Sequence, residues 1–309
     1  MAARPLRIGT RGSAMALFQA NLVRDRLAAA HPELAESGMI EIIVIRTTGD
    51  RVQNRLLAEI GGKGLFTKEI EEALIARRID LAVHSLKDME TALPPGLDIV
   101  CVLKRDDPRD VLVARGGAGL AALPAGAKIG TASLRRRAQL LRRRPDLAIA
   151  PIRGNVDTRL DKLAGGEVDG LLLALCGLQR LGRTAVASEI LPAEVMLPAV
   201  GQGALAIEAR SGDLEIRECL APLHHAASAA CVAAERAMLA ALDGSCRTPI
   251  AGLAELDGDR LGLRAMLLAA DGSAERRADG AGSAEDAAAL GREIGERLRS
   301  GAGPEFGLG

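Results

Sequence analysis

Aromatic side chains are nearly absent from this sequence, which has three Phe and neither Tyr nor Trp among its 309 residues. Proteins that bind single-stranded nucleic acids stack bases on aromatic side chains, so the composition argues against that class. Leu, Ala, Ile and Val must build the cores instead. The chain has 48% apolar and 26% charged residues, which is ordinary for a soluble globular protein, and its length allows two or three domains.

Net charge is also absent, because 40 Lys and Arg balance 40 Asp and Glu. No global field therefore attracts polyanions. Charge is nevertheless concentrated locally, since residues 131–160 contain eight Arg and only two Asp. This segment predicts a patch that binds small anions or phosphates.

Paired cysteines are missing as well. The five cysteines are odd in number and contain no Cys-x-x-Cys pair, which argues against a disulfide framework or a zinc site and favours a reducing compartment. Residues 1–5 lead into a strand without an apolar secretory segment, and no run reaches transmembrane length. We expect a soluble cytoplasmic protein that acts away from the membrane.

The most informative stretch is residues 79–88, where an apolar run ends in His84-Ser85-Leu86-Lys87-Asp88. This pattern predicts a buried strand that opens into a polar loop. In α/β proteins, ligands bind where such loops leave the sheet. A carboxylate beside a lysine stays ionised, so Asp88 is able to hold a cationic nitrogen or to move a proton. The alternative is a solvated loop with an ordinary Lys/Asp pair.

Residues 6–10 predict a first strand, followed by a helix over 14–30 that Ser13 caps. The free N–H groups at that helix start, with Arg11 beside them, predict either an anion site or simply a capped helix. A strand over 40–46 precedes a glycine-rich loop at 60–64 and a helix over 67–76. Three glycines in four residues are typical of a mobile lid, and the spacing is not that of a P-loop.

Residues 104–110 are highly charged and predict a segment that crosses between domains. The strands predicted over 111–113, 128–130, 149–152 and 170–174 come next. Arginines follow three of these strands, in the segments where the chain leaves the sheet. One of these segments is the start of a helix, with its cap within residues 131–133. Unpaired N–H donors and guanidinium groups both favour an anion, so we expect a shared anionic ligand.

Arg135, Arg136 and Arg137 follow that cap directly. Consecutive helix residues are about 100° apart, so the three cannot share one face. We expect one or two of them to face a site and the others to be solvated.

Residues 197–204 predict the return of the chain to the first domain, with a strand over 205–208 and a helix over 226–242. Short strands over 250–254, 261–268 and 274–278 precede a last helix over 285–298. Four cysteines lie in apolar runs, but Cys246 lies in a polar loop beside Arg247, where a thiolate is accessible and favoured. The alternative is a loop cysteine without a role.

Several motifs in order along nearly the whole chain resemble the porphobilinogen deaminase (hydroxymethylbilane synthase) family. They are Arg11 and Ser13 with Gln19; Gly61-Gly62-Lys63-Gly64-Leu65-Phe66; His84-Ser85-Leu86-Lys87-Asp88; Thr131-Ala132-Ser133-Leu134-Arg135-Arg136; Arg153-Gly154-Asn155 with Thr158-Arg159; Gly177-Leu178 with Arg180-Leu181; Pro198-Ala199-Val200-Gly201-Gln202-Gly203; and Gly244 with Cys246 and Pro249.

The resemblance implies an α/β fold of three domains, the first two like a periplasmic binding protein with two chain crossings and the third a small α+β domain. We expect domain 1 over 1–103 plus 200–220, domain 2 over 108–198 and domain 3 over 224–309. It also implies a dipyrromethane cofactor joined by a thioether to Cys246. The implied reaction joins four porphobilinogens head to tail, with loss of ammonia, in porphyrin biosynthesis.

The resemblance makes Asp88 the catalytic residue and implies no metal. Because each pyrrole carries acetate and propionate, a growing chain is a polyanion, which explains arginines at several strand exits. The implied cofactor- and substrate-binding residues are Arg11, Ser13, Lys63, Phe66, Ser85, Lys87, Thr131, Ser133, Arg135, Arg136, Arg153, Arg159, Arg180 and Gln202.

The chain departs from the family pattern at a few positions. Glu90 stands where the family usually has proline, and Glu59 where a lysine is common. Arg247 and Thr248 replace small or apolar neighbours of the cysteine. None of these changes removes a proposed catalytic group.

Two other classes compete with the enzyme. A solute-binding protein that holds a di- or tricarboxylate suits the fold and the arginines, but the missing signal peptide and the extra domain with Cys246 argue against it. A nucleic-acid binder that uses residues 135–144 is disfavoured by balanced charge and scarce aromatics. We expect a monomer that binds porphobilinogen, neither nucleic acid nor membrane, and passes its product to the next tetrapyrrole-pathway enzyme.

Overall fold

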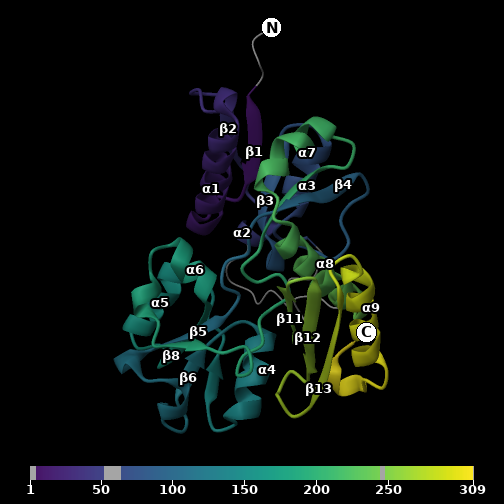
Figure 1. Cartoon of the computed structure of the whole chain (residues 1–309). Helices are drawn as coiled ribbons and strands as arrows, with labels where there is room; N and C mark the ends of the chain where they lie inside the picture. Colours follow the sequence, from purple (N-terminus) through teal and green to yellow (C-terminus); the bar gives the residue numbers. More distant parts are fainter. Residues whose placement is uncertain (1–4, 52–63, 244–247, 309) are drawn as a thin grey trace. The chain divides into compact units, whose positions relative to one another are not determined.

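The computed structural model describes residues 5–51, 64–243 and 248–308. Their contacts divide the chain into two compact units. Unit 1 comprises residues up to 105 together with 204–229, and unit 2 comprises residues 106–203 together with those from 230 onward. The chain therefore leaves unit 1, returns to it and leaves it again (Figure 1).

Unit 1 is built on a five-stranded sheet in the order β2-β1-β3-β10-β4. Strands β2, β1 and β3 are parallel, whereas β10 runs antiparallel to β3 and β4. The strands are β1 (Leu6–Thr10), β2 (Ile40–Val44), β3 (Leu81–Ser85), β4 (Leu97–Val102) and β10 (Leu205–Arg210). The helices are α1 (Ala14–Ala30), α2 (Thr48–Arg51), α3 (Lys68–Ile75) and α7 (Leu214–Leu220).

Strand β3 buries both of its faces. Leu81 and Val83 pack in one cluster with residues of α1, and Ala82 packs in another with residues of α3. Successive side chains of a strand point to opposite faces. His84 therefore faces the α3 side of the sheet, and Ser85 faces the α1 side.

Unit 2 contains a second sheet with the same plan, in the order β7-β6-β8-β5-β9. Strands β7, β6 and β8 are parallel, and β5 is antiparallel to β8 and β9. The strands are β5 (Asp110–Ala114), β6 (Lys128–Gly130), β7 (Ala148–Ala150), β8 (Gly170–Ala174) and β9 (Glu189–Leu191). The helices are α4 (Leu134–Arg143), α5 (Val156–Ala164) and α6 (Leu175–Arg180).

The last part of the chain forms an antiparallel sheet of β11 (Ile250–Asp257), β12 (Arg260–Leu268) and β13 (Glu275–Ser283). Residues of α8 (Ala226–Ala241) and α9 (Ala287–Arg299) share one apolar core with this sheet. The two helices approach closely at two glycines of α9, since a Cβ on Gly291 would lie 2.1 Å from the Ala234 carbonyl oxygen and one on Gly295 2.6 Å from that of Met238.

Three sheets with flanking helices confirm the predicted three-domain α/β fold class. The expected helices over 14–30 and 226–242 and the strands over 6–10, 128–130 and 170–174 agree with the structure to within a residue. The exact domain boundaries stay a prediction. No helix in the described ranges is both long and apolar enough to cross a membrane.

Candidate active site

In unit 1 polar residues follow the three adjacent parallel strands β1, β2 and β3, and those after β1 and β3 include predicted site residues. Arg11 and Ser13 follow β1, residues 47–50 follow β2, and residues 86–88 follow β3. Parallel strands end at the same edge of a sheet, and ligands of open α/β sheets bind there. The fold thus gathers these groups at one edge of unit 1.

Asp88 lies on a single 3-10 turn, η2 (Leu86–Asp88), and its side chain is exposed. Leu86 and Met89 on either side of it are buried. The Leu86 amide donates to the carbonyl of Ala204 at 3.1 Å, and the Met89 amide donates to that of Leu86 at 3.0 Å. The turn is therefore fixed by its apolar residues while it presents the carboxylate of Asp88 to solvent. Lys87 is partly exposed beside it.

The hydroxyls of Ser13 and Ser85 have internal partners. Ser13 caps α1, and its Oγ accepts from the Ala16 amide at 3.2 Å, as the sequence predicts. Ser85 Oγ accepts from Nε2 of Gln19 on α1 at 2.8 Å. This bond ties the end of β3 to the helix on that face of the sheet.

Arg11 forms an ion pair with Asp50, its Nε lying 3.1 Å from Oδ1. Its guanidinium also lies over the ring of Phe66, 4.2 Å from the centroid, a favourable cation–π geometry. Burial would raise the pKa of Asp50, but the hydrogen bond and positive charge of Arg11 lower it overall. Arg11 is therefore held in place before any ligand binds, and its partner Asp50 was not foreseen from the sequence.

In unit 2 the predicted arginine-bearing exits also share one edge. Residues 131–133 follow β6, Arg153 follows β7, and α6, which ends at Arg180, follows β8. The three strands are parallel neighbours. The structure thus brings these exits to one edge of the second sheet, and the anionic ligand expected there stays a prediction.

Arg135 and Arg136 are buried inside unit 2, where both pair with Asp110. Arg135 Nη1 donates to Oδ2 of Asp110 at 2.7 Å, and Arg136 Nη2 donates to Oδ1 at 2.7 Å. Asp110 is itself fully buried. Burial alone would raise the pKa of Asp110, but the charges and hydrogen bonds of the two arginines hold it far below its usual range. Arg137 is exposed, in line with the expectation that not all three share a face.

This cluster carries one more positive than negative charge. Burial lowers the pKa of Arg135, and Arg136 adds to that effect. Arg135 Nε is buried without a hydrogen-bond partner among the described residues. In the structure both arginines therefore pair with a residue of the protein itself. Their binding of substrate carboxylates stays a prediction.

Gln202, Thr131 and Ser133 also make internal bonds. Gln202 is buried, and its Nε2 donates to Asp110 Oδ1 at 2.8 Å. Ser133 caps α4 by accepting from the Arg136 amide at 3.4 Å, and its own amide donates to Thr131 Oγ1 at 3.2 Å. These three residues hold the start of α4 and the Asp110 cluster together.

The remaining predicted arginines differ in how they are held. Arg180 pairs with Asp106 at 2.9 Å and donates to the Gly203 carbonyl. Arg159 donates to the Gly154 carbonyl at 2.8 Å. Arg153 is half-buried, and its Nη1 is enclosed without a hydrogen-bond partner in the described part of the chain. An enclosed guanidinium N–H without an acceptor suits an anionic ligand.

Cys246 and Lys63 lie outside the described residues, as do Glu59 and Arg247. Three of the other four thiols are buried, and burial raises the pKa of Cys101 to about 12. Glu90, which stands at the usual proline position, accepts a hydrogen bond from the Gly64 amide at 2.9 Å. Among the described His, Cys, Asp and Glu side chains, no group of three could hold a metal ion.

The sequence pattern predicts that His84 belongs to the polar loop together with Asp88. This prediction is wrong, because His84 lies within β3. His84 is buried, and its Nε2 lies 3.0 Å from Oε2 of the fully buried Glu208 on β10. The alternation of β3 directs it into the unit. The apolar residues on both sides of Glu208 gave a hint that this glutamate is internal, but its partner could not be read from the sequence.

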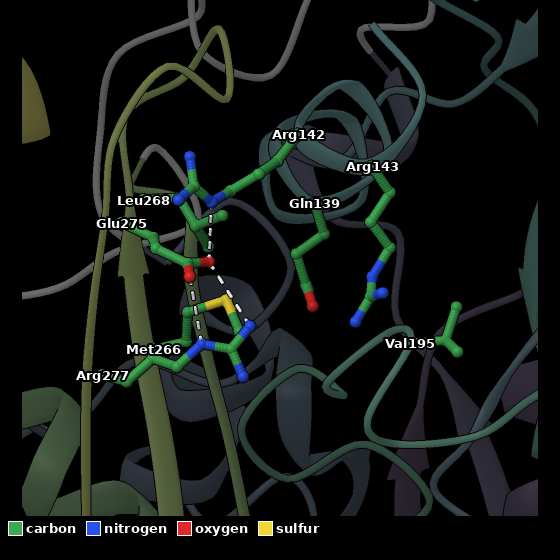
Figure 2. Close-up of a pocket in the computed structure, with 8 residues that line it drawn as sticks. All are labelled: Gln139, Arg142, Arg143, Val195, Met266, Leu268, Glu275 and Arg277. Carbon is green, nitrogen blue, oxygen red and sulfur yellow. Dashed lines mark hydrogen bonds and ion pairs between the residues drawn. The ribbon is translucent and has the colours of Figure 1, made fainter.

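A second feature of unit 2 is a hollow of about 210 Å³ between α4 and the strands β12 and β13. Figure 2 shows Glu275 at its wall, paired with Arg142 at 2.9 Å and with Arg277 at 3.2 Å. On the α4 side of the hollow (Figure 2), Arg143 donates to the carbonyl of Glu194. None of the predicted site residues that the structure describes lines this hollow.

Comparison with known proteins matches almost the whole chain. The family model "Porphobilinogen deaminase, dipyromethane cofactor binding domain" matches residues 6–218, and "Porphobilinogen deaminase, C-terminal domain" matches 229–300. Porphobilinogen deaminase of Paracoccus denitrificans is 54% identical over 98% of this chain and 96% of its own. That of Sorangium cellulosum is 51% identical over 96% and 99%.

Solved structures give a weaker likeness. The periplasmic aliphatic sulphonate binding protein SsuA from Escherichia coli is 16% identical, with a TM-score of 0.41 over 78% of this chain and 71% of that one. The fold class rests on the strand order itself.

Proposed function

Since the chain belongs to the porphobilinogen deaminase family, we propose that it joins four porphobilinogen molecules head to tail with loss of four ammonia. One water then cleaves the bond to the primer and supplies the hydroxyl of the released hydroxymethylbilane. The observation that carries the proposal is the pair of family matches, which together cover residues 6–218 and 229–300. The cofactor is dipyrromethane, in keeping with the domain matched by the first of them.

Each cycle breaks one carbon–nitrogen bond and forms one carbon–carbon bond. The aminomethyl group of porphobilinogen leaves as ammonia, which makes its methylene carbon electrophilic. The dipyrromethane, when bound, supplies the nucleophilic α-carbon that begins the chain. The proton on that carbon is lost afterwards, so the reaction needs a group that stabilises positive charge and accepts or relays a proton.

Asp88 is suited to that role. It is an exposed carboxylate on a turn whose flanking residues are buried, so it meets substrate while its backbone stays fixed. A carboxylate facing N–H donors stabilises the positive charge that develops on pyrrole nitrogens and takes part in proton transfer. In this proposal Lys87 and Ser85, at the same strand exit, contact the substrate's polar groups.

Arginines suit the carboxylates of the growing chain. Arg153 offers an enclosed N–H without a protein acceptor, and the Asp110 cluster keeps one positive charge in excess. The dipyrromethane carries carboxylates, so these residues fit it. Arg11, Arg159 and Arg180 add guanidinium groups that already have fixed positions.

Cys246 holds the cofactor in this proposal, through a thioether. The match of the chain to the family's C-terminal domain supports this assignment. So does the polar setting of Cys246 beside Arg247, which favours the thiolate. The finer expectations of a cytoplasmic monomer that passes its product onward belong to the same proposal, and gel filtration of the purified protein tests the monomer.

The deciding experiment is the intact mass of the purified protein beside the variant Cys246→Ser. We expect the wild type to carry the added mass of two linked pyrroles and the variant to lack it. An unmodified wild type is then incubated with porphobilinogen and weighed again. If it gains no mass and consumes no substrate, the proposed function is wrong; tight binding without turnover would favour a solute-binding protein instead.

A further inference from the structure

A buried polar cluster lies directly behind the strand exit that carries Asp88. His84 of β3 and Glu208 of β10 are in contact at 3.0 Å, with side chains 5% and 0% exposed. Glu71 of α3 is also buried, and the charges of Glu208 and His84 both act on it. Besides Glu208 of β10 and His84 of β3, the described groups that act on Glu71 are Thr67, which precedes α3, and Glu90 beyond η2.

The register explains why these side chains meet. In the antiparallel pair, His84 lies opposite Ala206, and Glu208 lies opposite Ala82. His84 and Glu208 are therefore diagonal neighbours on one face, within reach of each other across the ladder. That face is the one covered by α3, whose Ile70 and Leu74 pack with Ala82.

The cluster is poorly explained as a stabilising device. Both oxygens of Glu208 and Nε2 of His84 lack a hydrogen bond of good direction among the described residues, although the pair is in contact. Burying charges costs free energy that a single contact does not reliably return. Burial raises the pKa of Glu71 overall, although Thr67 and the charge of His84 act against that shift, and the charge of Glu208 adds to it. Replacing a buried ion pair by apolar residues of similar volume is often neutral or stabilising.

The location of the cluster suggests what it does. His84 is the last residue but one of β3, and Asp88 follows four residues later on η2. On the opposite face, Gln19 binds Ser85. The end of β3 therefore has side-chain contacts on both faces of the sheet, immediately before the turn that carries the Asp88 carboxylate.

We propose that His84 and Glu208 are positioning residues that hold the end of β3 so that Asp88 keeps its productive position. The inference rests on the proposed function, since Asp88 acts in that reaction. A misplacement of about 1 Å of a catalytic group costs on the order of 10²-fold in rate. Loss of the pair therefore reduces turnover rather than substrate binding.

The test uses His84→Gln and Glu208→Gln in cofactor-loaded enzyme, with turnover expressed per loaded molecule. We expect kcat to fall by about tenfold or more while KM for porphobilinogen changes by less than about twofold. We also expect the pH profile of kcat to change shape in both variants. If His84→Gln does not fold, Glu208→Gln decides alone, because it keeps the imidazole and the shape of the site.

Asp80→Asn is the matched control. Asp80 is also a buried carboxylate of unit 1, paired with Arg7 at 2.9 Å, but it lies before the start of β3, far along the strand from Asp88. We expect it to lower thermal stability and to leave kcat per loaded molecule and its pH profile unchanged.

Unchanged kcat in both Gln variants, or an equal loss in Asp80→Asn, overturns the inference. An inactive wild type would count against the proposed function instead.

Discussion

In the proposed function Asp88 has to be accessible while its backbone is fixed, and the turn on which it lies meets both needs. The carboxylate is exposed while Leu86 and Met89 beside it are buried. Asp88→Asn keeps the size of the side chain but removes its charge and its ability to take a proton. We expect turnover to fall by about 10²-fold or more, the range of general acid–base catalysis.

The measurement for Asp88→Asn is steady-state turnover of porphobilinogen, with circular dichroism to confirm an unchanged fold. The control is Asp98→Asn, a half-exposed carboxylate of the same unit that pairs with Arg217. That variant should retain full turnover. A fully active Asp88→Asn would remove the catalytic role of Asp88.

Asp110 is expected to contribute strongly to the stability of the fold, because it neutralises part of the charge of two buried arginines. Asp110→Asn leaves Arg135 and Arg136 without their carboxylate. Breaking a buried ion pair from one side costs about 3–5 kcal/mol of unfolding free energy. Asp157→Asn, which disrupts an exposed pair with Arg183, should cost less than about 1 kcal/mol. Urea unfolding of both variants measures the difference.

The same variant gives a pH prediction with a definite sign. The pKa of Asp110 is lowered in the folded protein, so its pairing stabilises the fold above the unfolded-state pKa of about 3.9 and is lost as the pH falls toward the folded value. The stability gap between wild type and Asp110→Asn should therefore be constant from neutral pH to about pH 5 and narrow below about pH 4. A gap that widens on acidification would contradict the assigned pairing.

At the scale of elements, the close contact between α8 and α9 depends on glycine, which has no side chain, at two positions of α9. Gly291 and Gly295 are one turn apart on α9, and a Cβ on either would collide with a backbone carbonyl of α8. In an exposed helix, replacing Gly by Ala stabilises by roughly 1 kcal/mol. Here the two helices would have to move apart, so the sign is expected to reverse.

We expect Gly291→Ala to lower the unfolding free energy by about 1–3 kcal/mol, the usual cost of overpacking. Gly282→Ala on β13 is the control, because its added Cβ meets no atom within 4 Å. Thermal unfolding of the two variants is the measurement. A stabilised Gly291→Ala would show that α8 and α9 yield easily at this contact.

At the scale of the whole molecule, the five thiols should differ sharply in reactivity. Cys101, Cys176 and Cys231 are buried, and the pKa of Cys101 is raised to about 12. Burial also raises the pKa of Cys219, and the charge of Glu33 adds to that shift. A thiol reacts through its thiolate, so these four should react slowly at pH 8.

Treatment of the folded Cys246→Ser variant with iodoacetamide should therefore leave nearly all of its thiols unmodified. After unfolding in urea, all four of its thiols should be alkylated. Cofactor-free wild type should take up one group quickly, at Cys246. Mass spectrometry after digestion locates the modified residues. Rapid labelling of Cys101 in the folded protein would contradict its burial.

Much of the architecture follows from the sequence alone. The strand over 6–10, the helix over 14–30 and the caps Ser13 and Ser133 agree with the structure because periodicity and capping are local signals. The order of motifs along the chain also identifies the family, since each motif keeps its residues and its place. Asp88 and Cys246 as the catalytic and attachment residues remain predictions from that order.

Only the tertiary structure decided where the charged residues of the interior belong. The sequence pattern predicts that His84 lies in the polar loop and that Arg135 and Arg136 bind a ligand. In the structure His84 of β3 faces inward to Glu208, and both arginines, at the start of α4, face inward to Asp110. The partners in these pairs are more than 20 residues apart in the chain, and the register of the strands and the packing of helices on them set which side chains meet.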